Sequence, residues 1–261
     1  MGMIRSPAVA DLFYPGDAET LSRTVATLLD EAGETKTPAP KALIVPHAGY
    51  IYSGPIAASA YACLRPYRDR YRRVILLGPC HRVPVRGLAL SNADAYRMPG
   101  GDVFLDKSAL KLLNVSGVRL FDRAHVGEHS LEVHLPFLQA VLDTFTVVPI
   151  VVGDASAELV ADVLGRLWGG DETLIVVSSD LCHYLPYEEA RVSDAATCEA
   201  VEHLDGSRIS QDMACGATPV SGLLLAARQH GLGVTTLDLR NSGDTAGDRE
   251  AVVGYGAWMF A

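Results

Sequence analysis

The stretch Thr173-Leu-Ile-Val-Val-Ser-Ser179 is an apolar run of strand-forming residues, followed by Asp180 and His183. Three other runs have the same design: Ala42-Leu-Ile-Val-Pro46 precedes His47, Val74-Ile-Leu-Leu-Gly78 precedes His81, and Val234-Thr-Thr-Leu-Asp-Leu-Arg240 precedes Asp244. In an open α/β sheet, ligands bind in the crevice beyond the carboxyl ends of the strands. We therefore expect these side chains, which are far apart in the chain, to converge on one polar site.

Segments with helical spacing alternate with the apolar runs. Leu21, Val25, Leu28 and Leu29 share one face of a helix over about residues 17–32. Further helices are expected at about 55–64, capped by Ser53, and at 128–142, where Pro136 should kink or restart the helix. Others are expected at 157–167, 187–204 and 219–229, with further strands at 145–152 and 251–260. This alternation predicts an α/β fold, a single three-layer α/β/α domain over the whole chain with a mostly parallel or mixed central sheet.

Composition excludes several classes of protein. Hydrophobic residues make up 49% of the 261 residues, which is enough to bury a sizeable core. The formal net charge is −9 and no long basic run offsets it, so no nucleic-acid partner is expected. No apolar stretch approaches the roughly 20 residues of a membrane helix, and the N-terminus lacks the pattern of a secretory signal. We expect a cytoplasmic protein with no membrane partner.

The five cysteines offer a competing chemistry. Their spacing contains no CxxC, which argues against a disulfide framework and a structural zinc site. Cys215 precedes an apolar helix, whose N-terminus could lower the pKa of the thiol and make it a nucleophile. No GxSxG, P-loop or GxGxxG motif is present in the sequence, which removes the common hydrolase and nucleotide-binding interpretations.

His47 and His81 are the first candidates for metal ligands. Each follows a strand and a proline, which keeps it out of regular structure, although a single histidine is more often structural than a ligand. Asp244 lies in the turn Asn241-Ser-Gly-Asp244 and would complete two histidines and one carboxylate. That set leaves open positions on a non-haem Fe(II) ion. The alternative for Asp244 is an ordinary Asx turn.

Asp180 and His183 are candidates for acid–base chemistry. An imidazole near a carboxylate can take up or release a proton near neutral pH, since its ordinary pKa is about 6.5. Asp180 could instead cap the next segment. His125 and His129, at i and i+4, would share a helical face. We favour Glu128 and His129 as groups that orient the metal ligands or form the pocket wall.

Several motifs occur in order along the chain. They are Val45-Pro-His-Ala-Gly-Tyr50, Leu77-Gly-Pro-x-His81, Glu128-His-Ser-Leu-Glu132, Ser178-Ser-Asp-Leu-x-His183 and Ser242-Gly-Asp244. Together they resemble the MEMO family, named for the mediator of ErbB2-driven cell motility, whose prokaryotic members are called AmmeMemoRadiSam system protein B. The resemblance covers the whole chain. It implies a fold similar to the class III extradiol, LigB-like dioxygenases, with a metal pocket at the strand ends.

The resemblance also implies roles for single residues. His47 and His81 match the metal ligands, and His183 matches the pocket histidine that acts as acid and base in the dioxygenases. Iron as Fe2+ is the implied cofactor, with another divalent ion or copper as alternatives. Some members place a cysteine in the final loop, where this chain has Asp244 and Thr245. The groups expected around the pocket are Glu128, His129, Tyr50, Cys182 and Thr245.

Two functions follow from this interpretation. The leading one is a MEMO family protein with a non-haem iron-type pocket, acting as a dioxygenase-like redox enzyme on an unknown small molecule. The alternative is a non-catalytic scaffold that uses the same pocket to bind a metal ion or a peptide. The family resemblance further implies a functional link to AMMECR1-type and radical SAM proteins.

Overall fold

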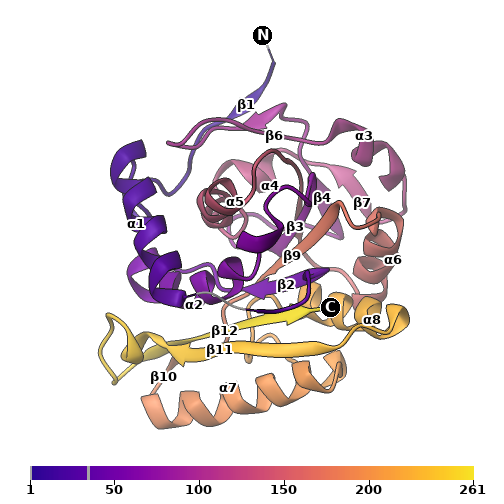
Figure 1. The fold of residues 1–261 in the computed structure, drawn as a ribbon. Helices are drawn as coiled ribbons and strands as arrows, with labels where there is room; N and C mark the ends of the chain where they lie inside the picture. Colours follow the sequence, from indigo (N-terminus) through magenta and orange to yellow (C-terminus); the bar gives the residue numbers. More distant parts are fainter. Residues whose placement is uncertain (1, 34–35) are drawn as a thin grey trace.

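A mixed nine-stranded sheet forms the centre of the computed structural model, which describes residues 2–33 and 36–261 (Figure 1). The strand order is β10-β12-β2-β9-β3-β8-β4-β7, and β11 pairs with β12. The strands are β2 (Ala42–Val45), β3 (Arg73–Pro79), β4 (Leu88–Leu90), β7 (Val118–Leu120), β8 (Thr146–Val152), β9 (Thr173–Ser178), β10 (His183–Leu185), β11 (Val234–Asn241) and β12 (Val252–Phe260).

The four central strands, β2, β9, β3 and β8, run parallel to one another. Strand β12 pairs antiparallel with β2 on one side, and β4 pairs antiparallel with β8 on the other. Because the parallel strands end at the same edge, the residues that follow β2, β3 and β9 lie close together. This edge positions the candidate site, and the expected mixed α/β sheet is confirmed.

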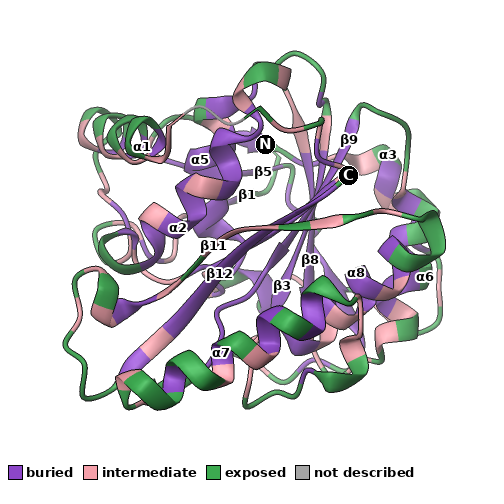
Figure 2. Ribbon diagram, turned by 60° about the horizontal axis from the view of Figure 1, so that its bottom comes forward, coloured by how far each residue is buried: buried purple, intermediate pink, exposed green. Residues whose placement is uncertain are grey.

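Helices cover both faces of the sheet, as Figure 2 shows, so the expected three-layer arrangement is confirmed. One side carries α1 (Ala18–Ala32), α2 (Tyr50–Ala62) and α5 (Leu135–Val141), and the other carries α6 (Ala157–Leu167), α7 (Tyr187–Glu202) and α8 (Ala217–His230). Alternation along β2 divides the core: Leu43 and Val45 pack into one apolar cluster, and Ala42 and Ile44 into the other. Burial on both faces explains why the central strands are continuous apolar runs.

Short elements complete the described chain. Strands β1 (Ile4–Arg5), β5 (Ala95–Tyr96) and β6 (Val103–Phe104) form a small second sheet. Two helices, α3 (Lys107–Leu110) and α4 (Arg123–Val126), are each a single turn. Among the described residues, no helix has the length and apolar character needed to cross a bilayer.

Two helix predictions were wrong in their boundaries. Helix α2 begins at Tyr50, so Ser53 does not cap it, and its hydroxyl donates to the carbonyl of Ala48 instead. The expected helix over 128–142 begins only at α5, after a 3-10 turn at Glu132–His134. The backbone at residues 128–131 is irregular, and the carboxylate of Glu128 accepts the N–H groups of His129 and Ser130 there.

A buried ion pair ties the N-terminus to this irregular segment. The guanidinium of Arg5 donates to the carboxylate of Glu132 at 2.5 Å and to the carbonyls of His125 and Glu128. The same carboxylate accepts the N–H groups of Ala8 and Val9 and the hydroxyl of Tyr14. Every partner is thus hydrogen-bonded, as a charge pair buried in the interior requires.

Glu132→Gln is expected to lower the free energy of unfolding by roughly 3–5 kcal/mol, because it leaves the Arg5 charge buried without its counter-charge. Urea denaturation of the two proteins measures the difference. Glu19→Gln is the control, since Glu19 is 85% exposed and pairs with Arg23 only at 3.9 Å. Equal losses in the two variants would contradict a special role for the buried pair.

His125 has a structural role. It does not share a helical face with His129, as the spacing of the two residues in the sequence had suggested. Its Nε2 lies 3.0 Å from the carbonyl of Ala89, and its Nδ1 lies 2.7 Å from the hydroxyl of Tyr96. A carbonyl only accepts, so Nε2 carries the hydrogen and Nδ1 accepts from Tyr96. Burial, with the nearby charge of Arg5, lowers the pKa of His125 to about 4.

His125 is expected to make the protein less stable in acid. The pKa of His125 is about 6.5 in the unfolded chain and lower in the folded one. At pH values between the two, the unfolded chain binds one more proton than the folded chain. The free energy of unfolding therefore falls as the pH falls, by up to about 3 kcal/mol. Urea denaturation at about pH 7 and about pH 4.5 should show a smaller pH dependence for His125→Gln than for the wild type. An identical pH dependence in both proteins would count against this role.

Candidate metal centre

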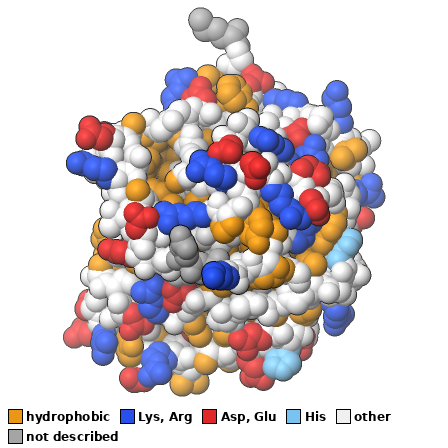
Figure 3. All heavy atoms as spheres, in the orientation of Figure 1, with side chains coloured by type: hydrophobic (Ala, Val, Ile, Leu, Met, Phe, Trp, Pro, Cys, Tyr) orange, Lys and Arg blue, Asp and Glu red, His pale blue; other side chains and the backbone are white. Residues whose placement is uncertain are grey.

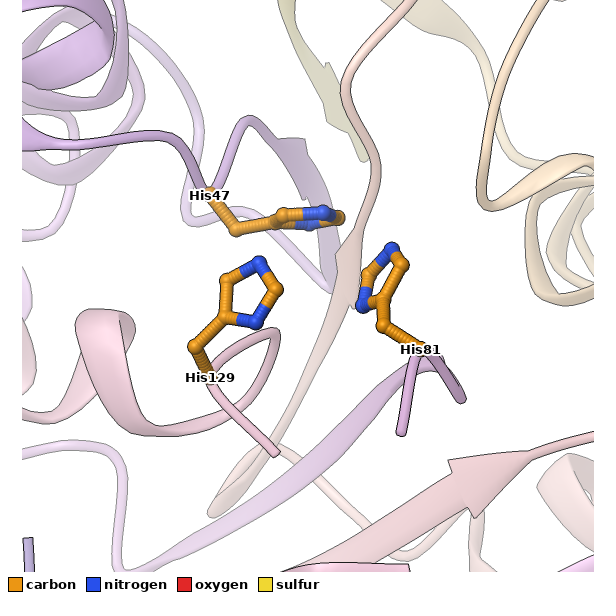
Figure 4. A group of neighbouring side chains, drawn as sticks. All are labelled: His47, His81 and His129. Atoms are coloured by element: carbon orange, nitrogen blue, oxygen red, sulfur yellow. The ribbon is translucent and has the colours of Figure 1, made fainter. Parts of the chain in front are cut away.

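Three imidazoles converge at the carboxyl edge of the parallel strands. His47 follows β2, His81 follows β3, and His129 belongs to the irregular segment before α5. One ligand nitrogen of each histidine lies within 4.8 Å of the other two. Ring centroids are 5.2 Å apart for His47 and His81, 5.4 Å for His47 and His129, and 4.7 Å for His81 and His129. Figure 4 shows the three rings facing a common space.

The tautomer of His47 is set by a chain of hydrogen bonds. Its Nδ1 lies 2.6 Å from the hydroxyl of Ser178, and that hydroxyl donates its only hydrogen to the carbonyl of Ser130, also at 2.6 Å. The hydroxyl must therefore accept from His47, so Nδ1 carries the hydrogen. The lone pair of His47 is left on Nε2, where a metal ion can use it.

Glu128 sets the orientation of His81. Its carboxylate accepts the backbone N–H of His81 at 2.6 Å and lies 2.8 Å from Nδ1 of the same residue. Burial opposes the ionisation of Glu128, but these bonds from His81 lower the pKa of the carboxyl to about 2. Because the carboxylate is an acceptor, Nδ1 donates and the lone pair of His81 lies on Nε2. Carboxylates behind metal-binding histidines have this function.

His129 is the third imidazole of the group. Its ring packs on Phe13 with centroids 4.9 Å apart, and its buried Nδ1 has no hydrogen-bond partner, although a Glu128 oxygen lies 3.4 Å away. A buried nitrogen without a partner is costly. The sequence placed His129 in the pocket wall. Its position among the ligands depends on the break in the helix at Glu128, which helical spacing alone did not predict.

Burial favours the neutral form of His47 and of His129. Burial is the main cause that lowers the pKa of His47 and of His129, and the neighbouring imidazoles add to it. A metal ion requires deprotonated ligands, so a neutral imidazole is ready to bind. Three neutral imidazoles suit zinc, copper, iron and nickel. The donor set therefore fits a transition-metal ion.

Asp180 and Cys215 lie next to His47. The carboxylate of Asp180 accepts the backbone N–H of His47 at 2.7 Å, and its second oxygen lies 3.9 Å from Nε2. The sulfur of Cys215 is 3.4 Å from the same nitrogen. Burial raises the pKa of Cys215 to about 12, and the charge of Asp180 adds to the rise. The prediction of an activated thiol at this helix start was therefore wrong.

His183 lies on the exposed side of this group, in β10. Burial chiefly lowers the pKa of His47 and raises that of Asp180, and the charge of His183 acts on both groups. The neighbouring Tyr184 is 75% exposed and has φ of 59°, in the left-handed region that residues other than glycine rarely adopt. Tyr255 in β12 is buried, and the charge of Asp180 adds to the effect of burial in raising the pKa of its hydroxyl; the sequence did not predict a role for it.

Residues 5–259 match the family model described as Memo-like protein. The chain belongs to the Memo-like family. A MEMO1 family protein of Aquifex aeolicus is 37% identical over 98% of this chain and 99% of its own length. MEMO1 family proteins of Methanothermobacter thermautotrophicus and Aeropyrum pernix are 35% and 36% identical, each over 97% of this chain and over 99% and 98% of their own lengths.

The Memo-like fold also resembles a solved structure outside these close relatives. An uncharacterized protein of Escherichia coli K12 superposes with a TM-score of 0.55 over 84% of this chain and 98% of its own. The two sequences are 14% identical, so the likeness concerns the fold alone.

In this Memo-like chain, the final loop does not place Asp244 as a third metal ligand. Asp244 lies outside the histidine group: its carboxylate accepts the hydroxyl of Tyr187 at 2.6 Å and the backbone N–H of Asn241 at 3.0 Å. Thr245 donates its hydroxyl to the carbonyl of Ser242. These bonds form the capped turn that was the alternative interpretation of the sequence.

Two expected pocket residues serve packing. Tyr50 is buried, its ring packs on Phe137, and its hydroxyl donates to the carbonyl of Val133. Cys182 is buried in a small apolar cluster, and its backbone N–H donates to Asp194. Burial raises the pKa of Cys182 to about 12, and the nearby Asp194 adds to the rise, so the thiol stays protonated at neutral pH.

Glu128→Gln is expected to weaken metal binding roughly 10- to 100-fold, the usual effect of losing an acceptor behind a ligand histidine. The amide keeps one acceptor oxygen, but its NH2 group would face N–H groups of His81, or of His81, His129 and Ser130, that need an acceptor. Isothermal titration with Zn2+ measures the change, and Glu188→Gln, at an exposed position, is the control. A thermal melt checks folding, and unchanged Zn2+ affinity in folded protein would contradict the role of Glu128.

Proposed function

We propose that this Memo-like protein binds one transition-metal ion through Nε2 of His47, Nε2 of His81 and one ring nitrogen of His129. The observation that carries the proposal is the pair of hydrogen bonds that fixes the hydrogens of His47 and His81 on Nδ1. Both lone pairs are then on Nε2, and one ring nitrogen of each histidine lies within 4.8 Å of the other two. His125 bonds through both ring nitrogens to oxygen atoms, whereas Nε2 of His47 lies 3.4 Å from the sulfur of Cys215, a weak hydrogen-bond partner.

Iron is the metal that we propose first. The resemblance to the LigB-like dioxygenases and the suitability of imidazole for iron support it, while copper and zinc suit the same ligands. A bound iron ion would supply redox chemistry, and three protein ligands leave coordination positions for a small-molecule substrate. The proposed reaction class is a dioxygenase-like oxidation of a small molecule.

Asp180 and His183 would transfer protons during the proposed reaction. Asp180 is buried, and burial raises the pKa of its carboxyl, so it can hold a proton closer to neutral pH than an exposed aspartate can. His183 is exposed in β10 and can exchange protons with solvent. We assign Asp180 to hold a proton near His47 Nε2, and His183 to pass it between the site and water.

Metal content of anaerobically purified protein tests the proposal. Elemental analysis should find about one metal ion per chain in the wild type, and His47→Ala/His81→Ala should lose it because two of three ligands are gone. His203→Ala is the control, since His203 is exposed at the end of α7, where its ring bonds to the carbonyl of Glu199.

Oxygen uptake with catechol-like compounds separates the two functions. Uptake that requires iron and His183 would support the enzyme, whereas stoichiometric metal without uptake would favour the non-catalytic binding role. A wild type that purifies and reconstitutes without any metal would overturn the proposal itself.

A further inference from the structure

A cavity of about 540 Å³ is lined by residues that neighbour two of the candidate ligands in the sequence. It lies between the two loops that carry ligands: Arg82 and Val83 follow His81, and Val126 and Gly127 precede His129 by two or three residues. Ala8, at the anchored N-terminal segment, and Arg123 complete the lining. The cavity is therefore built from the same segments that position the candidate metal ligands.

The lining of this cavity is positively charged, whereas the chain as a whole is acidic. Two arginines and no acidic residue line the cavity, although the sequence has 31 acidic residues and 22 basic ones. Many exposed arginines elsewhere are paired, such as Arg65 with Asp30 and Arg68 with Asp143, and Figure 3 shows red and blue side chains mixed across one face. Within the described ranges, Arg82 and Arg123 have neither an ion pair nor a side-chain hydrogen bond.

The rest of the cavity is apolar. Ala8, Val83 and Val126 form its walls, and Val126 is 64% exposed. A ligand that fits this lining has an anionic end for the guanidinium groups and a short apolar body. Guanidinium groups bind carboxylate and phosphate oxygens through paired hydrogen bonds.

Arg82 joins the two loops that carry candidate ligands. It directly follows His81 in the chain, and its Cγ lies 3.8 Å from the position that a Cβ on Gly127, two residues before His129, would take. A cation held by three neutral imidazoles would add further positive charge on this side of the molecule.

We infer that this cavity binds the carboxylate or phosphate group of a small molecule that carries a short apolar body, and holds the molecule beside the metal centre. Arg82 and Arg123 bind the anion, and Ala8, Val83 and Val126 contact the body. The role in presenting a substrate rests on the proposed function, whereas anion binding by the two arginines does not.

Calorimetry with matched probes tests anion binding. Wild-type protein is freed of metal with the neutral chelator 1,10-phenanthroline and titrated with benzoate, phenyl phosphate and neutral benzamide. At least one anion should bind, roughly tenfold or more tightly than benzamide, because charged hydrogen bonds are the stronger kind. Its affinity should fall with added salt, and the preferred anion distinguishes carboxylate from phosphate recognition.

Arg82→Gln/Arg123→Gln should weaken binding of that anion by about tenfold or more, by the loss of both charged donors. Arg166→Gln/Arg191→Gln is the matched control, since it removes the same charge from exposed positions on α6 and α7. The inference is overturned if neither anion binds, if benzamide binds as well as they do, or if both double variants lose affinity equally. Thermal melts verify that each variant is folded.

Location beside the metal centre needs a separate measurement. Protein loaded with paramagnetic Co2+ should broaden the proton resonances of the bound probe, whereas the Zn2+-loaded protein should not. Arg82→Gln/Arg123→Gln should keep its Co2+ and lose the broadening. Anion binding without broadening would overturn the placement beside the metal. Anion binding in a protein that takes up no metal would leave the anion site standing and remove the proposed function instead.

Discussion

One buried carboxylate, that of Glu128, organises the candidate centre. It accepts the backbone and ring N–H groups of His81 and the backbone N–H groups of His129 and Ser130. Four donors on one charged acceptor orient the ring of His81 and fix the backbone at His129. The same group therefore helps to position both imidazoles, and Phe13 packs against the ring of His129.

A second set of hydrogen bonds joins this segment to the sheet. Ser178, at the end of β9, bonds to the ring of His47 and to the carbonyl of Ser130, while the hydroxyl of Ser130 donates to the carbonyl of Pro79 at the end of β3. The ends of three parallel strands and the irregular segment are thus connected. Such connection through polar groups in the interior limits relative movement of the rings, because breaking any one bond leaves a buried group unpaired.

The sequence predicted the sheet and part of the site for a definite reason. Continuous apolar runs indicate buried strands, and parallel strands end at one edge of the sheet. His47 and His81 could therefore be placed close together from the sequence alone. His129 could not be placed in the same way, because apolar residues with helical spacing continue through a segment whose backbone is held by Glu128. Asp244 was predicted to be a ligand for a related reason. An aspartate whose carboxylate caps the backbone of its own turn has the same sequence pattern as a metal ligand in a loop.

The replacement of a carboxylate by an imidazole changes the charge of the site. Two histidines and a carboxylate would leave a dication with one net positive charge, whereas three neutral imidazoles leave both. Asp180 is near enough to His47 to offset part of that charge, yet burial raises the pKa of its carboxyl and works against its ionisation. The ionised carboxylate of Glu128, bonded to His81, supplies one negative charge beside the histidines, and an anion in the neighbouring arginine-lined cavity would supply more.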